Sequence, residues 1–190
     1  SSAASDVYKR QDVGTTGRAL ALQAVRASLE GAGEGSSVSV AAHVAGIGWQ
    51  DAASAPSYAG TVGQGRAVQA VRVSLSGPVS DSYDVWYRVH AAGYGWLGWA
   101  KDGEAAGTEG LGVQAEALQV VLVEKGGDAP SSGAPAELSV PSLSLRAHVS
   151  GVGWQAAVGN GGTAGTTGQS RAVEAITAEV SSPVSGGLSY

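Results

Sequence analysis

One short motif recurs four times along the chain, and this repetition limits the fold more than any other feature of the sequence. The motif is a Gly-Thr pair followed by a further glycine, and a segment rich in Ala, Val and Leu comes after each copy. The copies are VGTTG at 13–17, AGTVG at 59–63, AGTEG at 106–110 and AGTTG at 164–168. We number the repeats one to four after these motifs and expect them to share one local structure.

A second motif, His-x-x-Gly-x-Gly-Trp, precedes the Gly-Thr motif in repeats two, three and four. It begins at His43, His90 and His148. The step from the first histidine to the second is 47 residues, and the step from the second to the third is 58 residues. The longer step contains a Gly/Pro/Ser-rich run at 126–142, which predicts a linker or long loop.

The segment after each Gly-Thr motif is ambiguous in repeat one. RALALQAVRASL at 18–29 has high helix propensity and apolar residues at helical spacing. Its equivalents at 66–75 and 171–180 instead alternate with a period of two and are enriched in β-branched residues. Because repeats share a fold, we predict a strand in every repeat.

The residues before each histidine alternate in the same way. Val38, Val40 and Ala42 form one row in repeat two, and 85–89 and 143–147 carry equivalent rows. A unit of two alternating strands cannot bury its apolar face alone. We therefore predict an all-β fold in which repeats of ~47 residues pack as a pseudo-symmetric β-prism or β-trefoil-like domain, with an open array as the alternative.

Residues 1–11 (SSAASDVYKRQ) share no pattern with the rest of the chain. Written back into codons, they match a transposase-type sequencing adapter in frame, so we interpret them as an artefact and exclude them from the fold. Repeat one lacks a His-x-x-Gly-x-Gly-Trp motif, and we expect it to be truncated. We divide the remainder into repeats at 12–125, a linker at 126–138, and a further repeat at 139–190 that starts a second, incomplete domain.

Composition excludes several classes of function. The formal net charge of −5 gives no electrostatic footprint for a nucleic-acid partner. No apolar run approaches the roughly 20 residues of a membrane span. The absence of cysteine excludes disulfides, thiolate metal sites and a cysteine nucleophile. We predict no cofactor.

The order of these motifs resembles the clostridial hydrophobic (ChW) repeat. Repeat three keeps both tryptophans of the family pattern, Trp96 and Trp99, and the turn at 102–104, Asp-Gly-Glu. Repeats two and four have Ala52 and Ala157 at the second tryptophan position. The resemblance implies an extracellular module of Gram-positive bacteria, secreted or at the cell surface, with a role in adhesion or ligand binding. It implies no catalytic residues.

The tryptophans fall into two groups. Trp49, Trp96 and Trp154 recur once in each complete repeat, so we interpret them as core anchors rather than sugar-stacking platforms. Trp86 and Trp99 each occur in one repeat, and Trp86 alternates out of phase with its apolar row. An unrepeated, exposed tryptophan is a better ligand-binding candidate.

The remaining candidate residues favour binding over catalysis. The three repeated histidines, His43, His90 and His148, are interpreted as hydrogen-bonding structural residues, with a metal site as the weaker alternative because no acid or cysteine was found to recur beside them. Asp102 and Glu104 share one short turn, which is not the carboxylate pair across a cleft that glycosidases need. Asp102 is kept as a ligand-binding candidate.

From these features we predict a non-catalytic binding or adhesion module that recognises a glycan or cell-wall polymer, such as a cell-wall or plant polysaccharide. The alternative is a protein–protein scaffold or surface spacer with no small ligand, and a minor alternative is the accessory part of a secreted hydrolase. Exposed aromatic residues favour the first of these functions.

Overall fold

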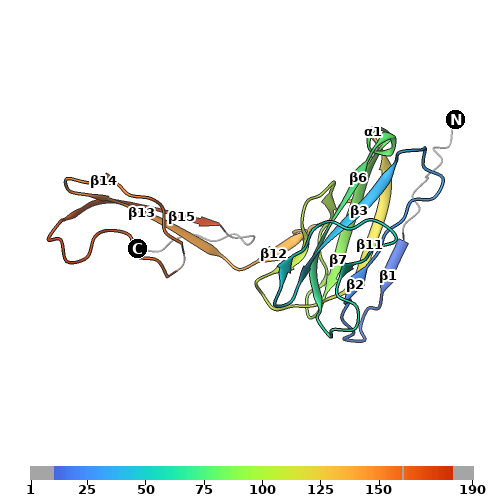
Figure 1. The fold of residues 1–190 in the computed structure, drawn as a ribbon, viewed down its shortest axis with the longest axis horizontal. Helices are drawn as coiled ribbons and strands as arrows, with labels where there is room; N and C mark the ends of the chain where they lie inside the picture. Colours follow the sequence, from blue (N-terminus) through green and yellow to red (C-terminus); the bar gives the residue numbers. More distant parts are fainter. Residues whose placement is uncertain (1–10, 160, 182–190) are drawn as a thin grey trace. The chain divides into compact units, whose positions relative to one another are not determined.

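The computed structural model describes residues 11–159 and 161–181, and nearly all of their regular structure is β (Figure 1). One short helix, α1 (Pro78–Ser82), connects repeats two and three. No helix among these residues has the length and apolarity to cross a membrane. The described residues form two compact bodies that divide between Leu138 and Ser139. The prediction of an all-β fold built from tandem repeats is confirmed.

Each complete repeat is a long antiparallel hairpin with a small inserted turn. In repeat two, β3 (Ser37–Val44) pairs along its length with β6 (Val68–Ser76), with Val40 opposite Val73. The His-x-x-Gly-x-Gly-Trp motif folds back so that β4 (Gly48–Trp49) pairs with the end of β3. Gly46 and Gly48 have φ values of 74° and 93°, which explains the glycines of the motif.

Repeats three and four have the same hairpin. In repeat three, β7 (Tyr83–Ala91) pairs with β11 (Ala115–Glu124) and with the return strand β8 (Gly95–Trp96). In repeat four, β13 (Ser142–Val149) pairs with β15 (Val173–Ser181) and with β14 (Gly153–Trp154). The three hairpins also share a register shift beside the histidine.

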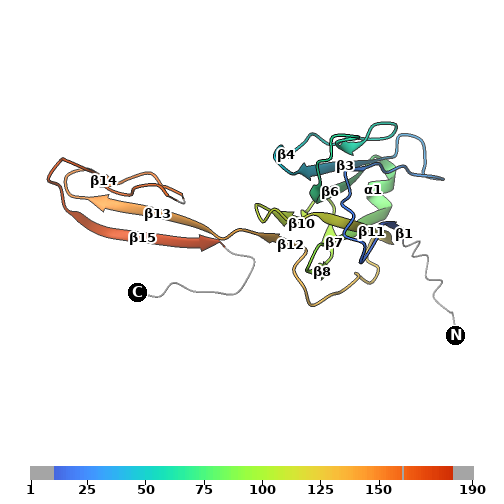
Figure 2. The ribbon, with the colours of Figure 1, turned by 90° about the horizontal axis from the view of Figure 1, so that it is seen from below.

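Two sheets form most of the N-terminal body, and they face each other (Figure 2). The first has the order β1-β11-β7-β8, where β1 is Gln11–Gly14, and β9 (Ala100–Lys101) also pairs with β7. The second has the order β12-β10-β6-β3-β4, where β12 is Glu137–Ser139 and β10 is Ala106–Glu109. A two-stranded pair, β2 (Ala24–Val25) with β5 (Ala59–Gly60), completes this body.

The core lies between these sheets and consists mainly of the alternating rows of the long strands. Val40 and Val73 from repeat two pack in one cluster with Tyr87 and Val89 from repeat three. The same cluster includes Val25 of repeat one. The period-two alternation therefore identified the buried face of both hairpins.

The Gly-Thr motifs join the repeats in a cyclic order. Gly14 of repeat one lies opposite Ala117 of repeat three, Gly60 of repeat two opposite Ala24 of repeat one, and Gly107 of repeat three opposite Ala70 of repeat two. A Cβ on any of these glycines would lie 2.3–2.4 Å from a backbone carbonyl oxygen of the neighbouring repeat. The close approach explains the glycine. Closure as a prism or trefoil stays a prediction.

The segment at 18–29 differs from its sequence-based interpretation. Within 18–29, only Ala24–Val25 forms a strand, and it pairs with Ala59–Gly60 of repeat two. Within 126–138, the end of the predicted linker is bound to the N-terminal body. Gly98 N donates to Pro135 O (2.8 Å) and Gly107 N donates to Ala136 O (3.0 Å).

The connection between β11 and β12 lies on the side of the first sheet that faces away from β3 and β6 (Figure 2). Val121 and Val123, which alternate toward that side, are buried. Of the segment interpreted as an artefact, Ser1–Arg10 lie outside the described residues, whereas Gln11 is the first residue of β1 and pairs with Val120. Residues 182–190, at the end of the predicted incomplete domain, also lie outside them.

Candidate functional site

The repeated histidine and tryptophan form one contact in each complete repeat. The two residues are cross-strand partners, His43 with Trp49 and likewise in the other repeats. Their rings meet edge to face, with centroid distances of 5.5, 5.3 and 5.4 Å and interplanar angles of 74°, 82° and 78° in repeats two, three and four. The near-identity of these values makes the contact a property of the repeat itself.

The prediction that Trp49, Trp96 and Trp154 are core anchors is wrong. The first two are half-buried and lie outside the core cluster, and Trp154 is 46% exposed. The histidine alternates out of phase with the buried valines of its strand, so its cross-strand partner also points to the outer face of the sheet. Valine and alanine fill the inner face instead.

An arginine lies over each of these tryptophans. Arg72 is 4.1 Å from the ring centroid of Trp49, Arg88 is 5.0 Å from that of Trp96, and Arg146 is 5.8 Å from that of Trp154. These distances are in the range of cation–π interactions. We call the three residues in each repeat the His–Trp–Arg cluster.

The arginine comes from either of two facing positions. In repeats two, three and four the arginine belongs to the cross-strand pairs Ala41–Arg72, Arg88–Gln119 and Arg146–Thr177. Each repeat thus has one arginine at this pair, on the second strand in repeat two and on the first strand in repeats three and four. Sequence analysis missed this residue, although an arginine two positions before the histidine in repeats three and four was a visible signal.

The histidines have carboxylate partners in two repeats. His90 Nδ1 is 3.1 Å from Glu116 Oε2, and His148 Nδ1 is 2.9 Å from Glu174 Oε2. Gln69 occupies the equivalent position in repeat two. The expectation that no acid recurs beside the histidines is therefore wrong for repeats three and four. In residues 11–159 and 161–181, no group of three or more His, Asp or Glu side chains is arranged to hold a metal ion.

In repeat three, the unrepeated tryptophans Trp86 and Trp99 lie on the same outer face of the sheet as Trp96. Trp86 points away from the core row of β7, as its alternation predicts, and Lys101 Nζ lies 5.6 Å from its ring centroid. Trp99 is half-buried, and the Arg88 guanidinium lies 4.7 Å from its ring. Arg88 therefore contacts both Trp96 and Trp99. We call Trp86, Arg88, Trp96 and Trp99 the aromatic face of repeat three.

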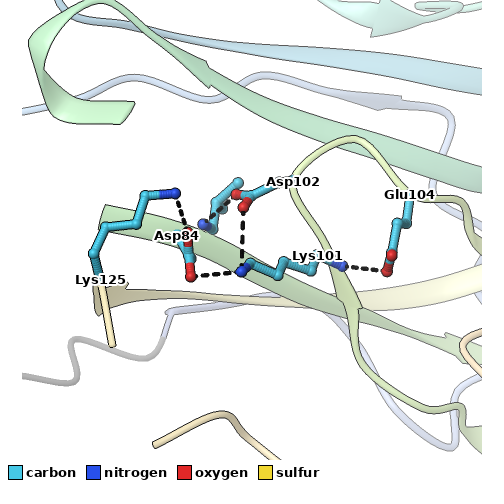
Figure 3. Close-up of polar contacts among 6 residues, drawn as sticks. Asp84, Lys101, Asp102, Glu104 and Lys125 are labelled. Carbon is cyan, nitrogen blue, oxygen red and sulfur yellow. Dashed lines mark hydrogen bonds and ion pairs between the residues drawn. The ribbon is translucent and has the colours of Figure 1, made fainter. Parts of the chain in front are cut away.

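The structure places Asp102 in a structural role at the edge of β7 (Figure 3). Its Oδ1 accepts a hydrogen bond from Val85 N (2.8 Å), and its own N donates to Val85 O (3.0 Å). Its φ of 42° is in the left-handed region that a tight turn needs. The carboxylate already holds the turn, which weakens Asp102 as a ligand-binding candidate.

An ion network lies beside this turn. Lys101 Nζ is 2.6 Å from Asp84 Oδ2, and Lys125 pairs with the other oxygen of the same carboxylate (Figure 3). Hydrogen bonds from Lys101 and Lys125 lower the pKa of Asp84 to about 2. Glu104 Oε2 accepts from Lys101 N (3.0 Å). Both carboxylates of the Asp-Gly-Glu turn thus accept backbone hydrogen bonds.

A second carboxylate pair lies near the His–Trp–Arg cluster of repeat two, and sequence analysis did not find it. Trp49 Nε1 donates to Glu109 Oε2 (3.2 Å). Burial and the neighbouring Glu109 raise the pKa of Glu137, and Arg72 opposes that rise. Glu109 and Glu137 come from β10 and β12, and the sheet order β12-β10-β6-β3-β4 brings them to the side of repeat two.

A family model described as Clostridial hydrophobic W matches residues 43–77, 90–124 and 148–181. Each match begins at the histidine of a His–Trp–Arg cluster and ends at or next to the last residues of the hairpin's second long strand. No curated protein and no solved structure matches the chain. The matched residues cover more than half of the chain and confirm the resemblance read from the motifs.

Proposed function

Because the chain belongs to the clostridial hydrophobic W repeat family, we propose that it is a non-catalytic extracellular binding module whose ligand is a glycan or cell-wall polymer. The aromatic face of repeat three carries this proposal. Arg88 lies over Trp96 and Trp99, Lys101 lies over Trp86, and none of these three tryptophans belongs to the core cluster. The three indole rings are half-buried on the outer face of the sheet, where the packing of the core does not require them.

The chemistry of this face suits a sugar. Flat indole rings stack against the apolar C–H faces of sugar rings. Each Å² of apolar surface buried in this way contributes about 25 cal/mol to the binding free energy. Arg88 Nε donates to Gln119 Oε1 (2.6 Å), which fixes the arginine between Trp96 and Trp99 before any ligand arrives. A rigid face loses little conformational entropy on binding.

Repeats two and four supply the internal comparison. They have Ser39 and Ser144 at the position of Trp86, and Ala52 and Ala157 at the position of Trp99. They keep the His–Trp–Arg cluster and lose the other two rings. This contrast supports a binding function located in repeat three rather than one shared by all repeats.

The test is titration of the full chain with a panel of cell-wall and plant polysaccharides. Trp86→Ala and Trp99→Ala are expected to weaken binding by about 10-fold or more each. Trp154→Ala removes the matching indole of repeat four and should leave the affinity unchanged. Equal losses in all three variants, or retained affinity in Trp99→Ala, would contradict the assignment to repeat three.

A protein–protein scaffold is the second candidate, and one observation favours it. The residue between the two glycines of the His-x-x-Gly-x-Gly-Trp motif is apolar and exposed in all three copies, as Ile47, Tyr94 and Val152. Apolar residues repeated at equivalent turn tips suit a protein surface with matching spacing. If the wild-type chain binds no polysaccharide of the panel, the scaffold replaces the glycan-binding function.

A further inference from the structure

The inner face of repeat four is exposed, although its residues match a buried face in repeat two. By strand register, Val173 and Ile176 on β15 are equivalent to Val68 and Val71 on β6. Val68 and Val71 are 0% exposed, whereas Val173 is 47% and Ile176 is 65% exposed. Val180, at the far end of β15, is also exposed. A sheet face of this composition is normally covered.

The N-terminal body shows what covers such a face. Each of its Gly-Thr motifs lies against the second long segment of another repeat, so that the glycine meets a Gln-Ala or Glu-Ala pair of that neighbour. Backbone hydrogen bonds extend the cycle, since Leu22 N donates to Ala115 O (2.8 Å) and Val68 N donates to Leu22 O (2.7 Å). The covering element is therefore another repeat of the same kind.

Repeat four has both halves of this contact, and among residues 139–159 and 161–181 neither half is paired with another repeat. Gly165 has a φ of 115°, close to the 126° of Gly107, so its backbone is already set for the contact. A Cβ added to Gly165 would lie near one atom, the Val173 side chain of its own repeat at 3.4 Å. Glu174 and Ala175 provide the receiving pair, equivalent to Gln69 and Ala70.

The three receiving pairs of the N-terminal body are already occupied. Ala24, Ala70 and Ala117 each lie opposite one of its own Gly-Thr glycines. A partner for Gly165 that follows the same pattern therefore brings a receiving pair of its own. Repeat four of another copy brings both a Gly-Thr glycine and a receiving pair, Glu174 and Ala175.

We propose that repeat four is a self-association module, in which three copies of the chain bring their fourth repeats together through the inner face of β13 and β15. Gly165 of each copy lies against Glu174 and Ala175 of the next, and the cycle of the N-terminal body is reproduced between chains. Electrostatic repulsion between copies does not oppose this association, because residues 139–190 contain two arginines, two glutamates and no other charged side chain. Cyclic symmetry closes the assembly at three copies.

Sedimentation velocity of the full chain, over a concentration series reaching about 1 mM, tests the proposal. The wild-type chain is expected to reach three times the monomer mass. Ile176→Asp and Val180→Asp place a charge in the proposed interface at exposed positions and should each leave a monomer. Thr177→Asp is the matched control, because it adds the same charge on the opposite face of β15 and should leave the trimer intact.

A wild-type chain that stays monomeric, or that stops at a dimer, would overturn the proposal. So would trimers that survive both Ile176→Asp and Val180→Asp, or trimers that Thr177→Asp dissociates. Circular dichroism checks that each variant is folded. Two interface variants are used so that the failure of one of them to fold does not decide the result.

Crosslinking identifies the surface directly, because the chain has no cysteine. Ala106 lies opposite Val71 in the N-terminal body, and the equivalent residues in repeat four are Ala164 and Ile176. The double variant Ala164→Cys/Ile176→Cys should therefore give a covalent trimer on oxidation. Monomers alone on a non-reducing gel would contradict the proposed register.

Discussion

Repeats two and four have the same sequence pattern and the same hairpin, but they differ in what surrounds them. Their histidine and tryptophan rings meet at 5.5 and 5.4 Å with angles of 74° and 78°. Their inner faces differ completely, since Val71 is fully buried and Ile176 is 65% exposed. The comparison separates two levels of structure. The hairpin and its outer cluster belong to the single repeat, whereas the core belongs to a group of repeats.

The largest expected difference concerns the Gly-Thr glycines. Gly107→Ala should destabilise the N-terminal body by about 4 kcal/mol or more, because the new Cβ would lie 2.4 Å from Gln69 O and the residue has a positive φ. Gly165→Ala has the strain without the clash and should cost about 1–3 kcal/mol. Urea denaturation of both variants in dilute solution, followed by hydrogen exchange of each body, measures the difference. Equal losses would show that the close contact between repeats is unimportant.

A smaller difference in stability is expected between substitutions on the inner faces of repeats two and four. Val71→Ala removes fully buried methyl groups and should cost about 2 kcal/mol. Ile176→Ala removes a larger side chain but from an exposed position, and it should change the stability of the dilute chain by less than about 0.5 kcal/mol. Denaturant melts of the two variants check this pair, and an equal or larger loss for Ile176→Ala would contradict the account.

A still smaller difference in stability is expected between the tryptophan variants of the His–Trp–Arg clusters in repeats two and four. Trp49→Ala loses the contact with Arg72 and the hydrogen bond to Glu109, so we expect a cost of about 1–2 kcal/mol. Trp154→Ala loses a longer arginine contact and should cost about 0.5–1 kcal/mol. A loss of 3–5 kcal/mol for Trp49→Ala would restore the core-anchor interpretation. Thermal melts of both variants provide the measurement.

The smallest effect is expected from the ion network, which repeat three has and repeat four lacks, since Ser142 takes the position of Asp84. The pKa of Asp84 is lowered from 3.8 to about 2, so its contribution is complete above pH 3.8 and is lost as the pH falls toward 2. Both lysine partners are partly exposed, which limits the effect. Melts of wild type and Asp84→Asn between pH 5 and pH 2 test it, and the variant should lose this part of the pH dependence.

The sequence was sufficient for the long strands of repeats two, three and four and for the buried rows of repeats two and three, because a period of two and a repeated pattern are local signals. Val40, Val73 and Tyr87 lie where alternation predicts them. The side of the repeated tryptophans was mispredicted, because once-per-repeat occurrence was taken to indicate a core residue. The phase of His43 relative to Val40 and Ala42, together with its pairing to Trp49, places both rings outside.

The candidate site was predictable only in part. Trp86 was placed correctly on the outer face from its phase in β7, since phase is again a local property. The position of Arg88 between Trp96 and Trp99 depends on how the turn after β8 folds back, which no local pattern encodes. The residue type of Asp102 does not reveal its hydrogen bond with Val85 N or its positive φ, because both depend on the folded turn.

Hydrogen exchange of β6 and β15 in dilute solution tests most directly the claim that a repeat buries its inner face only through neighbouring repeats. The two strands have equivalent sequences and equivalent hairpin partners, so local structure alone predicts equal protection of their amides. The account predicts protection in 173–181 that is at least about 100-fold lower than in 68–76, because a single hairpin opens far more readily than a packed core. Equal protection of the two strands would contradict it.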